Sequence, residues 1–149
     1  MVLTGLAARP VEVEVALGPG LPGTIIVGLA DQAVKEAKER CRAAVSSAGL
    51  GWPSAAVTIN LSPASTPKQG AHFDLAIVAA VLGAKSAVAV AELEGTVLMG
   101  ELGLDGRVRA VRGVLPALLA AAGEGFRRAV VPIAQLREAR LVGGLAVAG

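Results

Sequence analysis

Residues 60–82 read NLSPASTPKQGAHFDLAIVAAVL, and the predicted fold is built around this stretch. The apolar residues before it predict a strand over 55–61, and residues 71–82 predict a long apolar helix. Between them, residues 62–70 are too rich in Pro, Ser, Thr and Gly to form regular structure. A strand therefore leads through a polar loop to a helix N-terminus, where unpaired N–H groups and the helix dipole favour an anion. A plain connection stiffened by proline explains the same residues.

The composition indicates a single globular domain over residues 1–149. Hydrophobic residues make up 54% of the chain and charged residues 17%, which excludes a disordered protein. Aromatic residues are only 2%, so base stacking on single-stranded nucleic acid is disfavoured. The net charge of +2 is too small to indicate nucleic acid or an acidic membrane by itself. The single cysteine, Cys41, excludes an internal disulfide and a cysteine-based zinc site.

No segment of the sequence indicates secretion or a membrane. The first ten residues, MVLTGLAARP, lack a basic region followed by a long apolar core. The longest uncharged stretch, residues 43–67, contains three prolines and cannot span a bilayer as a helix. We therefore expect a cytoplasmic protein without a membrane partner.

The hydrophobic periodicity predicts an initial meander of strands, followed by alternating helices and strands. Residues 10–17, PVEVEVAL, alternate strictly and predict a half-buried antiparallel strand. Asp105-Gly106 predicts the turn of a hairpin over 100–109. Glu92 and Glu94 fall in a predicted loop. The remaining strands are expected over 2–7, 24–27, 96–99, 129–131 and 145–147, and the remaining helices over 31–48, about 113–122 and 133–140. The pattern predicts an α+β domain, a two-layer arrangement with a mixed sheet.

The predicted helix over 31–48 is amphipathic. Cys41 lies on its apolar stripe, where we expect a small buried core residue and not a reactive thiol. The opposite face carries Lys35–Glu39 and Glu36–Arg40 pairs at four-residue spacing, which is typical of a solvated surface.

Two segments together resemble a known family. One is TPKQG at 66–70 before an apolar helix, and the other is GELGLDGRV at 100–108 before Gly113 and an Ala/Leu helix. They resemble the proteolytic domain of Lon proteases and the Lon-like domain of RadA recombination proteins. More closely, the chain resembles the N-terminal, ChlI-like domain of the ComM/YifB family of magnesium-chelatase-like AAA+ ATPases. The matching stretches cover nearly the whole chain: RPVEV at 9–13, GLPG at 20–23, IVGL at 26–29, VTINL at 57–61, FDL at 73–75, GEL at 100–102, DGR at 105–107 and RGVLP at 112–116.

The resemblance implies a Lon-like fold that is catalytically degenerate. Lon enzymes use a serine at the start of the helix after this loop, and a lysine after the glycine pair that follows the hairpin. By alignment these positions fall at His72 and Leu115, which cannot supply a hydroxyl nucleophile and an amine base. We therefore expect no catalytic residue and no enzyme activity in this chain.

Two catalytic alternatives remain. The first is a Lon-like Ser/Lys hydrolase with a rearranged active site, in which Ser62 or Ser65 would be activated by Lys68. Lys68 is expected in a hydrated loop, where a lysine stays protonated and makes a poor base. The second is a small-molecule kinase, but residues 62–70 contain only one glycine, which is a weak signal for a phosphate loop.

His72 and Asp74 are predicted to be structural. His72 is the one histidine of the chain, and the sequence shows no further ligands of the kind that a metal site needs nearby. Asp74 lies near the predicted helix start, where a carboxylate can accept hydrogen bonds from unpaired N–H groups. We expect Asp74 to anchor the loop at 67–70.

The best candidate for a binding surface is basic. Arg107 and Arg109 are two residues apart and point to the same side of a predicted strand, and Arg112 lies just beyond it. Lys68 comes close to these arginines if the fold matches the family. These four residues are candidates for contact with DNA or with a neighbouring subunit. An ordinary solvated sheet edge explains them equally well.

The family resemblance also implies what this chain lacks. No Gly-x-x-x-x-Gly-Lys-Ser/Thr loop is present, so we expect no cofactor here, and ATP and Mg²⁺ bound only in a C-terminal AAA+ module outside this sequence. The expected partners are that module and the neighbouring subunits of a hexameric ring. The implied role is an accessory one in branch migration, recombination or natural transformation. The chain is expected to be a cut domain or a stand-alone homologue.

Overall fold

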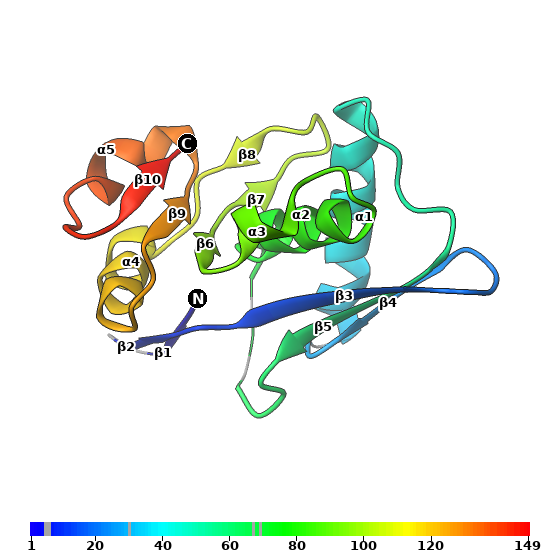
Figure 1. Ribbon diagram of the computed structural model, residues 1–149, viewed down its shortest axis with the longest axis horizontal. Coiled ribbons are helices and arrows are strands. Elements are labelled where there is room, and N and C mark those ends of the chain that lie inside the picture. Colours follow the sequence, from blue (N-terminus) through cyan, green and yellow to red (C-terminus); the bar gives the residue numbers. More distant parts are fainter. Residues whose placement is uncertain (5–6, 30, 67, 69) are drawn as a thin grey trace.

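The computed structural model describes residues 1–4, 7–29, 31–66, 68 and 70–149. Figure 1 shows two groups of helices and strands side by side, joined by a central hairpin. Each group encloses its own cluster of buried apolar side chains. We call these groups the first and second lobes, in chain order.

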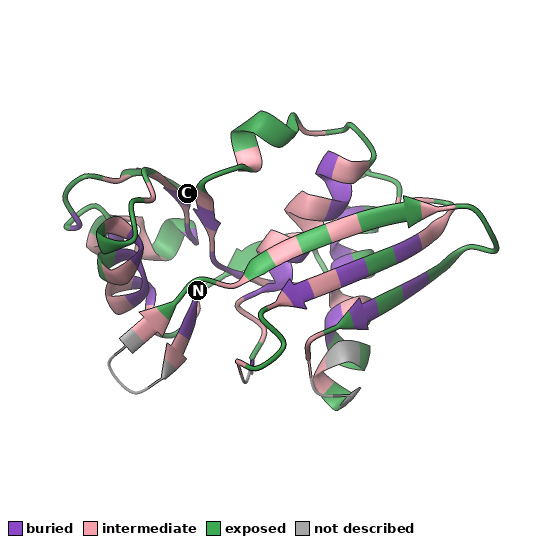
Figure 2. Cartoon of the chain, turned by 60° about the horizontal axis from the view of Figure 1, so that its bottom comes forward, coloured by how far each residue is buried: buried purple, intermediate pink, exposed green. Residues whose placement is uncertain are grey.

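The first lobe is a three-stranded sheet with two helices on one face. Its strands run in the order β3 (Glu12–Gly18), β5 (Ala56–Ser62) and β4 (Gly23–Val27). Helices α1 (Asp31–Ser47) and α2 (Asp74–Ala84) pack on the inner face, and the outer face carries no helix in Figure 2. The core of this lobe is therefore made by inward-facing strand residues and by the helices above them.

The predicted meander of early strands is wrong, because β5 lies between β3 and β4. Strand β5 runs antiparallel to β3 and parallel to β4. It carries the most apolar inner face of the sheet: Val57, Ile59 and Leu61 are at most 1% exposed. A central position buries that face most completely, which explains why the later strand separates the two earlier ones.

The second lobe is a parallel sheet, and its strands run in the order β10 (Ala146–Ala148), β9 (Arg128–Val130) and β6 (Thr96–Leu98). It packs with α4 (Val114–Gly123), with the one-turn η1 (Ile133–Gln135) and with α5 (Leu136–Ala139). The predicted α+β class is confirmed. The strands form several small sheets and not one mixed sheet.

The hairpin predicted from the Asp105-Gly106 turn is present, and it lies between the two lobes in Figure 1. Strand β7 (Glu101–Leu102) pairs with β8 (Val108–Arg109), and the amide of Gly103 donates to the carbonyl of Arg107 at 2.9 Å. The hairpin tip packs on the end of α1, because the Ser47 hydroxyl donates to the carbonyl of Leu104 at 2.6 Å. The hairpin is thereby fixed to the first lobe.

Three local predictions differ from the structure. The strand expected over 2–7 is instead a small antiparallel pair, β1 (Val2–Thr4) with β2 (Ala7–Arg9). The loop around Glu92 contains a short helix, α3 (Val90–Leu93). Helix α2 begins at Asp74, three residues later than expected, because residues 71–73 form a turn in which the Asp74 amide donates to the Ala71 carbonyl at 3.1 Å.

In the parts of the chain that the structure describes, no helix is both long and apolar enough to cross a membrane.

Gly28 allows the chain to turn from β4 toward α1. Its φ is +94°, a conformation that side chains disfavour, and a Cβ atom there would collide with the backbone carbonyl of Leu61. Gly49 also has a positive φ of +71°, but a Cβ atom at that position would meet open space. A substitution at Gly49 therefore introduces backbone strain alone, whereas a substitution at Gly28 introduces strain together with a steric collision.

We predict that Gly28→Ala destabilises the protein by about 3 kcal/mol, since strain and a backbone collision act together. Gly49→Ala is the matched control and should cost about 1 kcal/mol from strain alone. Urea denaturation followed by circular dichroism measures both. Equal costs for the two variants would show that the collision at Gly28 relaxes freely.

Candidate functional site

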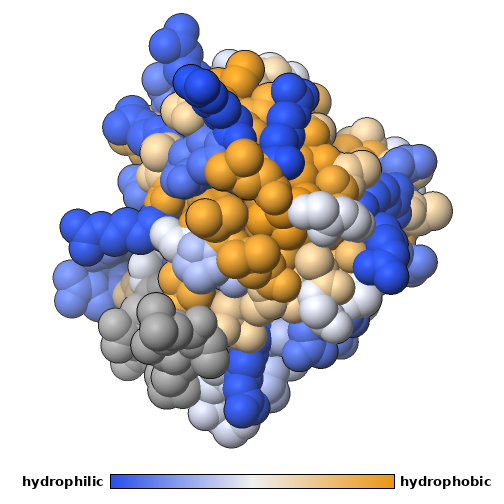
Figure 3. All heavy atoms as spheres, turned by 90° about the vertical axis from the view of Figure 1, so that its left-hand side faces the viewer, coloured by the Kyte–Doolittle hydropathy of each residue, from blue (hydrophilic) through white to orange (hydrophobic). Residues whose placement is uncertain are grey.

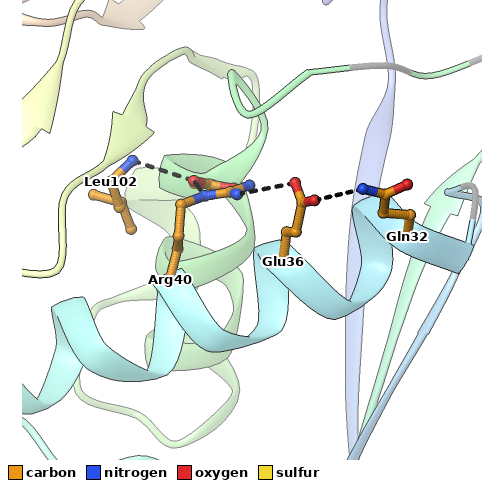
Figure 4. A network of polar contacts seen from close by, with 5 residues as sticks. Gln32, Glu36, Arg40 and Leu102 are labelled. Atoms are coloured by element: carbon orange, nitrogen blue, oxygen red, sulfur yellow. Dashed lines mark hydrogen bonds and ion pairs between the residues drawn. The ribbon is translucent and has the colours of Figure 1, made fainter.

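Asp74 joins three elements at the start of α2. Its side chain is 1% exposed and accepts hydrogen bonds from Arg40 Nε at 2.7 Å and from a second guanidinium nitrogen at 3.2 Å. It also accepts from the backbone amide of Leu102 at 3.2 Å. Figure 4 shows this network, in which α1, α2 and β7 meet at one carboxylate.

The described partners of the Asp74 carboxylate are Arg40 on α1 and the Leu102 amide on β7, and the anchoring of the loop at 67–70 stays a prediction. Residues 67 and 69 of the expected loop lie outside the described residues. Arg40, which the sequence places on a solvated face, is the residue that sequence reasoning missed. It is half-buried, and the expected i,i+4 partner, Glu36, lies 3.8 Å away with Gln32 donating to it at 3.1 Å. The one sequence feature that could have indicated a half-buried Arg40 is its position next to Cys41, which lies on the apolar stripe of α1.

The chemistry of this network is that of a fixed ion pair. Burial raises the pKa of Asp74, while the Arg40 guanidinium and the Leu102 amide act in the opposite direction. The hydrogen bond from Arg40 to Asp74 raises the pKa of Arg40. Burial also raises the pKa of the Cys41 thiol, whose Sγ lies 3.8 Å from the Asp74 carbonyl. Cys41 is fully buried, as predicted, and stays a protonated core residue.

Lys68 is buried, contrary to the expectation of a hydrated loop. The residue is only 4% exposed, and its Nζ donates to the carbonyls of Pro63 at 2.6 Å and Thr66 at 3.1 Å. Lys68 thus satisfies the backbone of its own loop and does not belong to an exposed basic surface. Within the described residues, no hydrogen bond joins Lys68 to a serine hydroxyl, so the rearranged Ser/Lys pair has no contact to support it.

His72 and Leu115 have structural contacts. His72 lies in the turn before α2, where its Nε2 donates to the Met1 carbonyl at 3.1 Å and its ring packs against Phe73. The amide of Gly100 donates to the His72 carbonyl at 3.1 Å. Leu115 packs against the core of the second lobe. Burial, together with the nearby α-amino group, lowers the pKa of His72.

The three arginines after the hairpin turn are exposed. Arg107 directly precedes β8, Arg109 lies on it and Arg112 follows it, and we call these three residues the arginine cluster. None of the ion pairs in the described part of the chain involves them. The segment that carries Arg112 is held in place by Gln135, whose side chain pairs with both the amide and the carbonyl of Val111 at 2.9 and 2.8 Å.

No metal site emerges from the described residues, because they contain no group of three or more His, Cys, Asp or Glu side chains able to hold an ion. The candidate for a binding surface stays the exposed arginine cluster, on and beside a hairpin whose tip is bonded to α1 through Ser47.

Comparison with known proteins identifies the family. The sequence pattern of the family described as Subunit ChlI of Mg-chelatase matches residues 13–135. The chain belongs to this family. It is 51% identical over 145 residues to an uncharacterised protein of Mycobacterium tuberculosis, covering 97% of this chain and 29% of that protein.

Two named relatives bear out the predicted ComM/YifB resemblance. Competence protein ComM of Haemophilus influenzae is 39% identical over 138 residues, which are 93% of this chain and 27% of the relative. The uncharacterised protein YifB of Escherichia coli is 39% identical over 140 residues, which are 94% of this chain and 28% of the relative. The chain thus spans less than a third of the length of these relatives.

We predict that Asp74→Ala costs about 3 kcal/mol of stability, since it leaves the half-buried Arg40 and the Leu102 amide without their acceptor. Glu92→Ala is the control, because Glu92 is 73% exposed and pairs with Arg128 at 3.0 Å on the surface. An exposed pair of this kind should contribute less than about 1 kcal/mol. Chemical denaturation compares the two, and a similar loss in both would contradict the anchoring role of Asp74.

The lowered pKa of His72 predicts a pH effect on stability. The folded protein binds a proton at His72 less readily than the unfolded chain, so stability should fall as the pH drops from 7 to 5. In His72→Gln this part of the decline should disappear, since the amide cannot titrate. Thermal unfolding across this pH range measures the difference, and parallel curves for both proteins would exclude His72 as the cause.

Proposed function

We propose that this chain is a non-catalytic accessory domain of a ChlI-like AAA+ ATPase that presents the arginine cluster to DNA. The proposal follows the relatives, one of which is named a competence protein, and it assigns the chain a role in assembly and in guiding DNA. ATP and Mg²⁺ would be bound by another part of such a protein, since residues 1–149 contain no phosphate-binding loop.

The observation that carries the proposal is the free positive charge of the arginine cluster. Two other arginines of the chain form ion pairs: Arg40 pairs with Asp74, and Arg128 pairs with Glu92. Arg107, Arg109 and Arg112 are exposed and close in sequence on a segment fixed by Gln135. Guanidinium groups bind phosphate well because they present several N–H donors in a fixed plane.

The absence of catalysis in this chain is part of the same proposal. The positions that correspond to the Lon dyad are His72 and Leu115. The His72 imidazole is hydrogen-bonded to the Met1 carbonyl, and Leu115 packs against the core of the second lobe. Lys68 is bound to two carbonyl oxygens. Lys68 is therefore no free base for Ser62 or Ser65, and the rearranged hydrolase is the less favoured alternative.

We predict that the chain binds labelled duplex and forked DNA at low salt and that Arg107→Ala/Arg109→Ala/Arg112→Ala loses this binding. If all three arginines contact phosphates, log affinity should fall with log salt at a slope of about −2.7 on duplex DNA. Fluorescence anisotropy over a salt series measures the affinity and the slope.

The control variant is Lys35→Ala/Lys38→Ala/Arg42→Ala on α1, which removes the same charge from another surface. It should retain most of the binding. If both variants lose binding equally, net charge and not the arginine cluster is responsible. If the chain does not bind DNA at low salt, the DNA part of the proposal fails.

A further inference from the structure

A cavity of about 760 Å³ is lined by residues of both lobes. The beginning of β3 lines it from the first lobe and β6 lines it from the second, while α2 and α3 complete the wall. Figure 1 shows β3 passing below α2 and α3, with β6 beside them, and Figure 2 shows the alternation of exposed and buried residues along β3. The volume is within the range of cavities that bind ligands in proteins. We call this space the interlobe cavity.

Two open sheet edges border the interlobe cavity. Strand β3 is an edge strand of the first lobe and β6 is an edge strand of the second, each with one neighbour among the described strands. Consecutive residues line the cavity in both places, over 10–13 and 94–98. Because successive side chains of a strand point to opposite faces, such a run means that the backbone edge itself borders the cavity. An edge strand directs alternate N–H and C=O groups away from its neighbour, so a further strand can pair there.

The surface between the two edges is apolar. Helix α2 contributes Ala76 and Ala80, whose short side chains leave space above the helix, and α3 contributes Val90, which is 53% exposed. Val13 and Val15 of β3 add branched side chains that are only half-buried. Covering these groups with apolar side chains removes them from water and favours binding. Figure 3 shows another apolar area, over the end of the second lobe, but no open strand edge is known to border it among the described residues.

The charge at the interlobe cavity is acidic. Glu12 and Glu94 line it, both are exposed, and neither carboxylate takes part in an ion pair within the described part of the chain. The described lining includes no lysine or arginine. A ligand that places a basic group beside its apolar side chains therefore complements this cavity, whereas an acidic ligand is repelled.

We propose that the interlobe cavity binds an extended peptide segment of a partner protein, with alternating apolar side chains and at least one basic residue. The segment pairs as an added strand with β3, which at seven residues offers a longer edge than the three residues of β6. Its apolar side chains cover α2, and its basic side chain lies near Glu12 and Glu94. A small apolar molecule fills the same space but leaves the hydrogen-bonding groups of the edge without partners, so a peptide fits the cavity better.

This inference goes beyond the proposed function. It concerns a protein partner, and it uses neither the arginine cluster nor DNA. The DNA-binding experiment and the peptide experiment therefore succeed or fail independently.

The test uses a fluorescein-labelled peptide, Lys-Val-Thr-Val-Thr-Val-Lys, whose valines share one face of a strand and whose lysines cover either orientation. Fluorescence anisotropy measures its affinity for the chain. Two further peptides carry N-methyl groups, one on the valine nitrogens and the other on the threonine nitrogens. A strand paired along one edge uses the N–H groups of alternate residues, so one methylated peptide should bind at least about tenfold more weakly and the other should bind like the parent.

Two variants of the chain locate the site. Ala76→Leu/Ala80→Leu fills the cavity above α2 and should abolish binding of the peptide. Glu12→Gln/Glu94→Gln removes the acidic groups and should weaken binding about threefold to tenfold. The control for the second variant is Glu39→Gln/Glu124→Gln, which removes the same charge at two exposed residues that do not line the cavity, and it should bind like the wild type. Circular dichroism checks that each variant folds, and the glutamine variants decide the result if the leucine variant does not.

Three results would overturn the inference. The first is that the wild-type chain does not bind the peptide. The second is that the two methylated peptides bind equally, since this excludes pairing along one edge. The third is that substitutions at the cavity affect binding no more than the control does.

Discussion

The buried carboxylate of Asp74 is the constraint on which the arrangement of the first lobe and the hairpin depends. A carboxylate that is 1% exposed is stable only with its acceptor sites filled, and here Arg40 and the Leu102 amide fill them from two other elements. The direction of α1, the start of α2 and the position of β7 are thus fixed by one side chain. The hairpin carries the arginine cluster, so the orientation of that cluster depends on an ion pair far from it in sequence.

Much of the fold can be predicted from the sequence where the signal is local. The alternating PVEVEVAL, the Asp105-Gly106 turn and the apolar stripe of α1 predict β3, the hairpin and α1 within a few residues. The sheet order cannot be predicted in this way, because β5 takes its place between β3 and β4 through long-range burial of Val57, Ile59 and Leu61. The periodicity of a strand indicates which of its faces is buried, but it does not indicate which other strand pairs with it in the sheet.

The candidate site was predictable only in part, for a related reason. Charge and spacing find Arg107, Arg109 and Arg112, since exposed side chains need no partner. The same reasoning misplaces Lys68 and Arg40, whose positions depend on acceptors elsewhere: the carbonyls of Pro63 and Thr66 for one, and Asp74 for the other. A cation that compensates a buried acceptor has the same appearance in sequence as one that faces solvent. The two are distinguished by three-dimensional contacts.

The first two residues belong to different cores. The Met1 side chain is buried among residues of the second lobe, and Val2 is buried in the cluster of the first. The hydrogen bond from His72 to the Met1 carbonyl lies at the same point. Met1 and Val2 are joined by a single peptide unit. A movement that withdraws one of these side chains from its core therefore pulls on the other side chain in the other core. The two lobes are therefore expected to lose structure in one cooperative transition, and the chain behaves thermodynamically as one unit although its apolar interior is divided.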